Sequence, residues 1–239
     1  MKRHFKTLVM VMTCMAMALC VSCKKDDNNE PTGGGADIPG DSDGLFFGHE
    51  YVDLGLPSGT LWATSNLGPG SFWEFVNYFA WGETTNKTGF SWRNYKWCED
   101  DVYTLSKYNT DSVYGAIDNK TVLDLEDDAA HANWGGNWRM PTYEEMVELK
   151  EKCTWTWIDN YKGFMVTGPN GKNIFLPAAG HCQMDIYLAG TVGYYWSGSL
   201  NSSNPRSAHF LYFSRSGVYV DSEKRCYGHA VRPVCSPQN

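Results

Sequence analysis

The chain has 239 residues, of which 20 are Lys or Arg and 27 are Asp or Glu, and its formal net charge at pH 7 is −7. Three of the basic residues, Lys2, Arg3 and Lys6, precede the first apolar run, so the remainder carries 17 basic against 27 acidic residues, a formal charge of −10. That balance argues against nucleic acid and anionic membrane surfaces as partners, because both are bound through clustered Lys and Arg.

The first 22 residues are typical of a secretory signal. A short basic start is followed by an apolar run from Leu8 to Val21. A run of this length is too short for a membrane-spanning helix, which needs about 20 apolar residues. It ends in "LCVSC", which resembles the lipobox of bacterial lipoproteins and predicts lipidation of Cys23. An ordinary secretory signal cut nearby is the alternative.

The residues after Cys23 indicate where in the cell the protein is located. "KKDD" resembles the tag that sends lipoproteins of Bacteroidetes-type bacteria to the outer face of the outer membrane. Two acyl chains are enough for stable anchoring. We therefore expect a surface-exposed outer-membrane lipoprotein, with residues 1–22 as signal peptide and the membrane as a partner through the lipid alone.

Residues 23–44 are predicted to be a flexible linker, since Ile38 is their one large apolar residue and they cannot bury enough surface to fold. Residues 45–239 have the length of one domain with a sizeable core. Aromatic residues make up 15% of the chain, so some are expected at the surface, where rings bind sugars and proteins.

The first part of the domain reads as strands followed by an irregular insert. Strands are predicted at Tyr51–Leu54 and Thr60–Thr64, joined by a Pro-Ser-Gly turn, and residues 76–83 form a third apolar run. From Thr84 to Lys120 no periodicity is evident, and long irregular inserts often carry function.

Two sets of aromatic residues are candidates for ligand binding. In the insert, Trp92, Tyr95 and Trp97 alternate with polar residues, a pattern that suits stacking on sugar rings or docking of a protein. The alternative is that these rings cover the sheet. Trp155 and Trp157 alternate after a helix, which places both on one face of an extended segment.

Two helices are expected in the middle of the domain. "LDLEDDAAHANW" predicts a short one with acids in its first turn. The second begins at Thr142, where Glu145 completes a capping box, and Met146, Leu149 and Cys153 supply its buried stripe.

The second half of the domain is predicted to be β. A hairpin turns at Asn170-Gly171, the strongest short hairpin signal. Four short strands follow in "GYYWSGS", "SAHFLYFS", "GVYVDS" and "GHAVRPV". The whole domain is therefore expected to be α+β, with a twisted antiparallel sheet, two short helices and long irregular loops.

Five cysteines follow the lipidation site: Cys98, Cys153, Cys182, Cys226 and Cys235. An exported protein permits disulfides, but the odd number leaves at least one thiol unpaired or paired between chains. Closeness in sequence makes Cys226 and Cys235 a candidate pair. No Cys-x-x-Cys pair or His-rich spacing indicates a zinc site, so we expect no metal and no cofactor.

Six ordered motifs across residues 47–235 resemble the family named for the Fibrobacter succinogenes major paralogous domain. They are "YVDLGLPSGTLWAT", "YFAWGET", "DDAAHANWGGNWRMPT", "IFLPAAG", "GYYWSGS" and "AVRPV". The resemblance implies a C-type-lectin-like fold related to the formylglycine-generating, sulfatase-modifying group. It also implies an exported or surface lipoprotein.

A corner before the second helix belongs to this resemblance. "WRMPTYEEM" at 138–146 is similar to the corner of that fold group, with Arg139, Pro141 and Thr142 matching and Met140 in place of leucine. Pro141 restricts the residue before it to an extended conformation. We interpret the stretch as a structural corner and not a ligand site. Its residues are Trp134, Gly135, Gly136, Trp138, Arg139, Pro141 and Thr142.

The residues give little support for two specific functions known in that fold group. Formylglycine-generating enzymes use a close cysteine pair late in the chain, and the eight residues between Cys226 and Cys235 do not match it. A lectin-type calcium site needs carboxylates that "GPNG" at 168–171 lacks. Glu126, Asp127 and Asp128 could hold a cation, or could cap and solubilise a helix start.

The sequence therefore predicts a non-catalytic domain that binds an extracellular glycan or protein. A structural or adhesive component of fimbriae is the second hypothesis, and an oxidoreductase of the formylglycine-generating type is the third.

Overall fold

The computed structural model describes residues 40–69 and 76–237. The signal peptide, Cys23 and the linker up to residue 39 lie outside the described residues. The fold begins before residue 45, because the Asp41 amide donates to the Asn173 carbonyl at 3.2 Å and Asp43 pairs with Lys172. Residues 41–44, which the sequence assigns to the linker, are therefore part of the folded domain.

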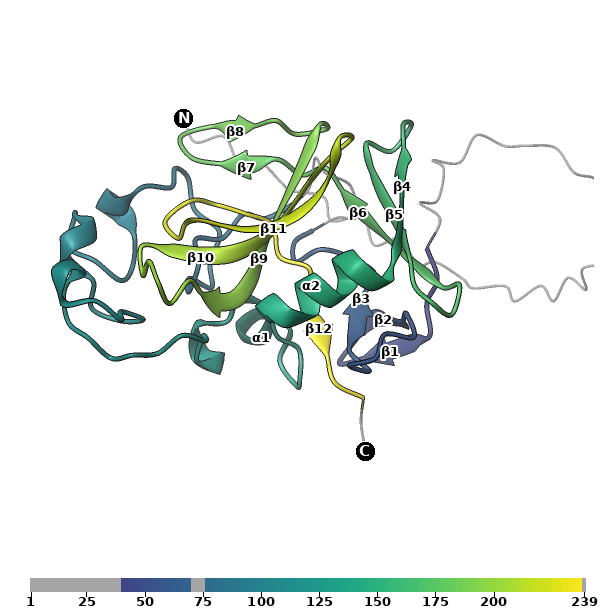
Figure 1. The fold of residues 1–239 in the computed structure, drawn as a ribbon, viewed down its shortest axis with the longest axis horizontal. Helices are drawn as coiled ribbons and strands as arrows, with labels where there is room; N and C mark the ends of the chain where they lie inside the picture. The colour runs from purple at the N-terminus through teal and green to yellow at the C-terminus, as the bar shows by residue number, and fades with distance from the viewer. Residues whose placement is uncertain (1–39, 70–75, 238–239) are drawn as a thin grey trace, which may run out of the picture. The chain divides into compact units, whose positions relative to one another are not determined.

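Most of the strands are antiparallel and lie in several small sheets, with two short helices (Figure 1). One sheet has the order β1-β2-β3-β12, made of β1 (Gly44–Phe46), β2 (His49–Asp53), β3 (Leu61–Ala63) and β12 (Val234–Cys235). The two predicted N-terminal strands correspond to β2 and β3. Because β12 pairs with β3, the first and last strands of the domain meet in this sheet.

Two three-stranded sheets carry most of the remaining strands. They are β4 (Thr154–Ile158), β5 (Gly163–Thr167) and β6 (Asn173–Pro177), and β9 (Val192–Leu200), β10 (Ser207–Ser214) and β11 (Gly217–Lys224). A two-stranded hairpin is formed by β7 (His181–Cys182) and β8 (Ile186–Tyr187). The predicted Asn170-Gly171 hairpin is confirmed as β5–β6. "GHAVRPV" departs from its prediction, since only its last residue, Val234, lies in a strand, which continues to Cys235.

The apolar run at residues 76–83 is not a strand of any sheet. Phe79 and His229 form an isolated bridge, and Tyr78, Phe79, Ala80 and Trp81 are all buried. A half-exposed strand would bury alternate residues, so this run is instead an extended core segment covered on all sides.

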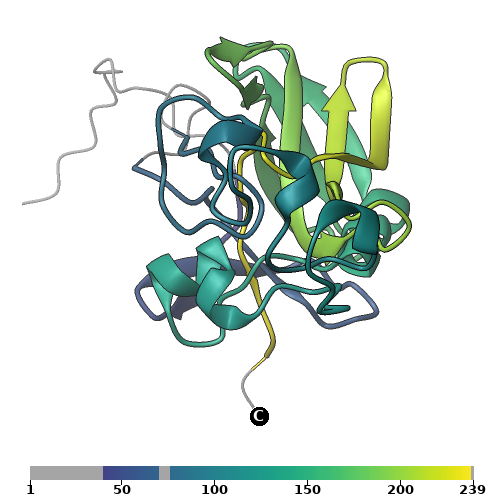
Figure 2. The ribbon, with the colours of Figure 1, turned by 90° about the vertical axis from the view of Figure 1, so that its left-hand side faces the viewer.

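The insert from Thr84 to Lys120 is irregular, as predicted, and faces the viewer in Figure 2. Its regular structure is confined to single 3₁₀ turns: η2 (Trp92–Asn94), η3 (Val102–Thr104) and η4 (Ser112–Tyr114). The Asp101 and Asp111 side chains accept from the amides of Tyr103 and Val113 and so begin the last two turns.

The first predicted helix is broken into η5 (Leu125–Asp127) and α1 (Ala129–Trp134). Asp128 lies at the break. Its carboxylate accepts the amides of Ala130, His131 and Met140, which caps α1 and ties it to the corner that follows. The acidic residues predicted to lie in one first turn are therefore split between η5 and the N-cap of α1, which is Asp128.

The second helix, α2 (Tyr143–Lys152), has the predicted capping box between Thr142 and Glu145. Met146 and Leu149 are buried, and α2 packs against β9, β10 and β11. Cys153, expected as the end of the buried stripe, is the residue that ends the helix and is half-buried.

The aromatic residues of the corner before α2 pack against β1 and β2. Trp134 stacks on His49 with ring centroids 3.8 Å apart, and the fully buried Trp138 donates from Nε1 to the Phe46 carbonyl at 2.9 Å. Gly135 ends α1 at φ +72°, and the space beside it is open. Glycine is therefore favoured at this position by the backbone conformation and not by lack of space for a side chain. A Cβ on Gly136 would lie 2.6 Å from the Phe47 ring, so at Gly136 glycine is required because a side chain would clash.

Among the described residues, no helix is both long and apolar enough to span a bilayer.

Candidate functional site

Tyr95, which the sequence offered as a surface ring, is inside the protein. It is 2% exposed, and its hydroxyl donates to the Trp81 carbonyl at 2.6 Å. The Arg225 guanidinium lies over its ring at 5.3 Å. No face of this ring is open to a ligand, and Tyr95 is corrected to a core residue of the insert.

The other two aromatic residues of that set differ from each other. Trp97 donates from Nε1 to the Gly82 carbonyl at 2.9 Å, and the ammonium groups of Lys96 and Lys107 lie 4.2 and 5.0 Å from its ring. Trp97 therefore holds the insert down, as the covering alternative expects. Trp92 is half-buried and lines a small cavity described below.

Trp155 and Trp157 share one face of β4, as their alternation predicts, while Thr154 and Thr156 are exposed. That face is directed at the core, and both indoles make edge contacts with Phe164 at 5.6 and 5.3 Å. These two residues anchor β4 and present little surface to a ligand.

The acidic stretch around η5 is neutralised by lysine. Asp124, Glu126 and Asp127 bring carboxylate oxygens within 4.8 Å of one another, and the Lys107 ammonium contacts them at 2.7, 3.2 and 2.6 Å. Burial favours the neutral form of Asp127, but hydrogen bonds from Lys107 and Lys96 outweigh it and lower its pKa. The cluster ties the insert to the domain, and its charge is balanced by side chains.

All five cysteines of the domain are free thiols in the structure. Cys226 packs beside Cys98 and Cys182 in one cluster, whereas Cys235 packs beside Trp138 in another, so the pair suggested by their closeness in sequence does not form. Burial raises the pKa of Cys226 to about 12 and that of Cys235 to about 11. Both thiols are protonated at neutral pH, and reactive cysteines require the thiolate.

A continuous row of five rings crosses the β7–β8 hairpin and the β9–β11 sheet. We call it the aromatic row: Tyr187, His181, Tyr194, Tyr212 and Tyr219. Successive ring centroids are 5.6, 4.7, 5.2 and 6.0 Å apart. The hairpin lies beside the sheet in Figure 1, and the contact of His181 with Tyr194 joins the two.

Strand register assembles this row. Tyr212 of β10 pairs with Tyr194 of β9 on one side and with Tyr219 of β11 on the other, which places three tyrosines in line across one face. The intervening residues, such as Leu211 and Phe213, point to the opposite face and are buried against α2 and the main core.

The row is open to solvent at both ends. Tyr187 is 44% exposed and Tyr219 is 51% exposed, while Tyr194 and Tyr212 are half-buried. The Tyr219 ring folds back along its strand, since a Cβ on Gly217 would lie 2.9 Å from the Tyr219 hydroxyl. The hydroxyls of Tyr194, Tyr212 and Tyr219 have no hydrogen-bond partner within the described part of the chain.

Further aromatic rings pack beside the row on the same face of the sheet. Tyr194 stacks on Phe210 at 5.5 Å, and the fully buried His229 stacks on Trp196 at 3.9 Å and contacts Tyr194 at 5.1 Å. Burial lowers the pKa of His229 well below its usual value, so this imidazole is neutral. This packing holds the tyrosines in place before a ligand binds, which reduces the entropy lost on binding.

Acidic groups accompany the row along β11. Asp221 and Glu223 follow Tyr219 on the same face, at two-residue steps that together span about 13 Å for an extended strand. Burial raises the pKa of Tyr194, and neighbouring Tyr212 and Glu223 add to the effect, which places the Glu223 charge near the row.

Glu223 also lines a cavity that lies along β11 from Tyr219, beyond Asp221. We call it the Trp92 pocket; it has a volume of about 210 Å³ and is formed by Trp92, Val102, Asn204, Arg206, Ser207, Glu223 and Lys224. The pocket combines an indole ring with hydrogen-bond donors and acceptors, a mixture found in ligand sites. It thus joins two residues of the insert, Trp92 and Val102, to the exposed face of the sheet.

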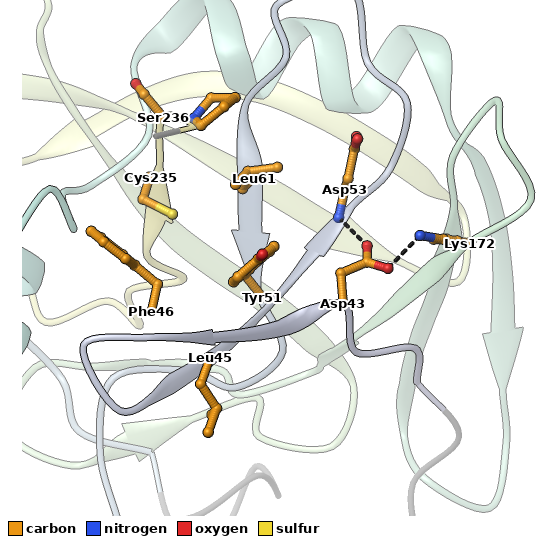
Figure 3. Close-up of a pocket in the computed structure, with 10 residues that line it drawn as sticks. Asp43, Leu45, Phe46, Tyr51, Asp53, Leu61, Lys172, Cys235 and Ser236 are labelled. Atoms are coloured by element: carbon orange, nitrogen blue, oxygen red, sulfur yellow. Dashed lines mark hydrogen bonds and ion pairs between the residues drawn. The ribbon is translucent and has the colours of Figure 1, made fainter. Parts of the chain in front are cut away.

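A larger cavity, of about 460 Å³, lies between the β1–β2 hairpin and the residues after β12 (Figure 3). Its charged groups already satisfy one another: the Asp43 carboxylate accepts the Asp53 amide at 2.8 Å and pairs with Lys172. Cys235 on its wall is 1% exposed. Because these polar groups already interact with one another, we interpret the cavity as a packing junction between the two ends of the domain.

No protein-family model, curated protein or solved structure matches the chain.

Proposed function

We propose that this chain is a surface lipoprotein whose domain binds a glycan outside the cell, without catalysis, through the aromatic row. The motifs given above support membership of the major paralogous domain family and a C-type-lectin-like fold. The signal, the lipobox and the "KKDD" segment support anchoring at Cys23 on the outer face of the outer membrane. The aromatic row is the observation that carries the binding proposal.

Sugar rings present C–H groups on their faces and hydroxyls at their edges, so a good site offers aromatic surface and polar groups together. The row supplies four phenol rings, and three of its hydroxyls have no partner among residues 40–69 and 76–237. Asp221 and Glu223 beside them can accept hydrogen bonds from sugar hydroxyls. Rings held on a rigid sheet are better placed for stacking than rings on a mobile loop.

A glycan array with the purified chain tests this proposal. We expect binding that the double variant Tyr212→Ala, Tyr219→Ala weakens at least tenfold, because stacking on aromatic side chains contributes about 1–3 kcal/mol per ring to ligand binding in other proteins. Phe47→Ala is the matched control, since Phe47 is 63% exposed and its ring contacts Phe46 in the turn between β1 and β2, and no ring of the row. Unchanged binding by the double variant, or equal loss in both variants, would contradict the proposal.

A second candidate function rests on the β7–β8 hairpin. Met184, Ile186 and Leu188 are 75%, 56% and 53% exposed, and they adjoin Tyr187 of the aromatic row. An apolar tip of this kind suits a protein partner and would favour the role of a structural or fimbria-associated component. Copurification of pilin subunits with the chain, lost when Ile186 and Leu188 are changed to Ser, would support this second function.

A further inference from the structure

Arg206 is held in one position at the wall of the Trp92 pocket. Its Nε donates to the Asn204 side-chain oxygen at 3.1 Å, and its guanidinium carbon lies 5.0 Å from the centre of the Tyr114 ring. Its own carbonyl accepts the Arg225 amide at 3.0 Å, which fixes the backbone. The side chain is therefore clamped from two sides before any ligand binds.

The two terminal amino groups of the Arg206 guanidinium are available to a ligand. Neither terminal amino group of Arg206 has a hydrogen-bond or ion-pair partner among the described residues, although the side chain is half-buried. The other arginines that are at least half-buried in the described ranges are engaged: Arg139 by Glu145, Arg225 by two carbonyls and Arg232 by four oxygens. Arg206 is the exception.

The charges that line the pocket favour an anion. Arg206 and Lys224 face one carboxylate, that of Glu223, so the lining carries a formal charge of +1. Glu223 already accepts the Lys224 amide at 2.8 Å, which occupies one of its oxygens. A hydrogen bond with Tyr227 raises the pKa of Lys224, so its ammonium stays charged.

We propose that the Trp92 pocket binds the carboxylate of an acidic sugar, such as a uronic acid, at one end of a glycan that lies on the aromatic row. The two free amino groups of Arg206 form a fork that matches a carboxylate, and the Trp92 ring in the same lining offers an apolar surface for the sugar face. Next to Tyr219, Asp221 repels further carboxylates, whereas at the pocket Arg206 and Lys224 outweigh Glu223, so the acidic residue belongs at the pocket and neutral residues follow. This inference rests on the proposed glycan-binding function.

Paired saccharides provide the test. The full chain is titrated with uronate-containing oligosaccharides and with the same oligosaccharides after reduction of each carboxyl group to an alcohol. We expect the acidic form to bind at least tenfold more tightly at low salt, since a charge-assisted pair is roughly twice as strong as a neutral hydrogen bond. Arg206→Lys, which keeps the charge and removes the fork, should abolish most of that preference and leave binding of the reduced form unchanged.

Arg93→Lys is the matched control, because Arg93 is an exposed arginine next to Trp92 that does not line the pocket. Equal affinity for acidic and reduced forms, or a preference that survives Arg206→Lys, would overturn the carboxylate subsite. If the Tyr212→Ala, Tyr219→Ala variant still lost binding in that case, the proposed function would stand. Absence of binding to every glycan would overturn both.

Discussion

The Glu145 carboxylate accepts four hydrogen bonds that hold the corner before α2, so its removal tests whether that corner is structural. It accepts hydrogen bonds from both terminal amino groups of Arg139 at 2.7 Å and from the Thr142 amide at 2.8 Å. The Thr60 hydroxyl donates to it at 2.6 Å from the loop before β3.

The loss on changing Glu145 to Ala follows from these contacts. The Glu145 side chain is 11% exposed and its Arg139 partner 28%, so the pair is largely shielded from water. Breaking a buried pair costs about 3–5 kcal/mol, and the partial exposure of Arg139 places this one near the lower limit. Loss of half the capping box adds about 1 kcal/mol. We expect a decrease of about 3–4 kcal/mol in the free energy of unfolding.

Chemical denaturation at pH 7 measures this change, with Glu144→Ala as control. Glu144 occupies the same helical turn but is exposed, so its loss should cost less than about 1 kcal/mol. Burial opposes ionisation of Glu145, but the Arg139 hydrogen bonds prevail and lower its pKa. Its contribution is therefore full above the usual glutamate pKa of 4.5 and declines as pH falls below that value. Equal costs for the two variants would refute this reasoning.

Three further predictions concern buried groups. Arg232→Leu should destabilise the domain by about 3–5 kcal/mol in denaturation experiments, because four buried oxygens lose their donor. Cys226 and Cys235 should react with a disulfide reagent at pH 8 only after unfolding, since both are 1% exposed, and prompt reaction of the native chain would contradict their burial. Because the pKa of His229 is lowered, the unfolded state gains a proton below pH 6.5 that the folded state does not. Stability should therefore fall from pH 7.5 to pH 5, and His229→Phe, which keeps a ring on Trp196, should reduce that slope.

Local signals predicted the elements whose structure depends on neighbouring residues. The capping box of Thr142 and Glu145 and the Asn170-Gly171 hairpin follow from contacts within a few positions, and both are present. The irregular character of residues 84–120 also followed, because the sequence there lacks any period. The break at Asp128 did not, since the helical pattern continues across it and the Met140 amide that it accepts is twelve residues away.

The aromatic row could not be predicted from the alternation of apolar and polar residues alone, because it depends on tertiary contacts. Buried residues of β10 lie on both of its faces, among them Phe210 and Leu211, so no polar stripe marks Tyr212 as part of a surface. The pattern "GVYVDSEK" does alternate, and Tyr219, Asp221 and Glu223 could have been assigned to an exposed face from it. The partners of Tyr219, and the way the β7–β8 hairpin adds His181, depend on register between segments distant in sequence.

The measurement that tests glycan binding at the aromatic row most directly is amide hydrogen exchange with and without the best-binding saccharide from the array. We predict slower exchange within β10 and β11 and in the turn around Arg206. Residues lining the cavity near Asp43 should be unchanged. Protection confined to that cavity, or no change in β10 and β11 at saturating saccharide, would contradict the account.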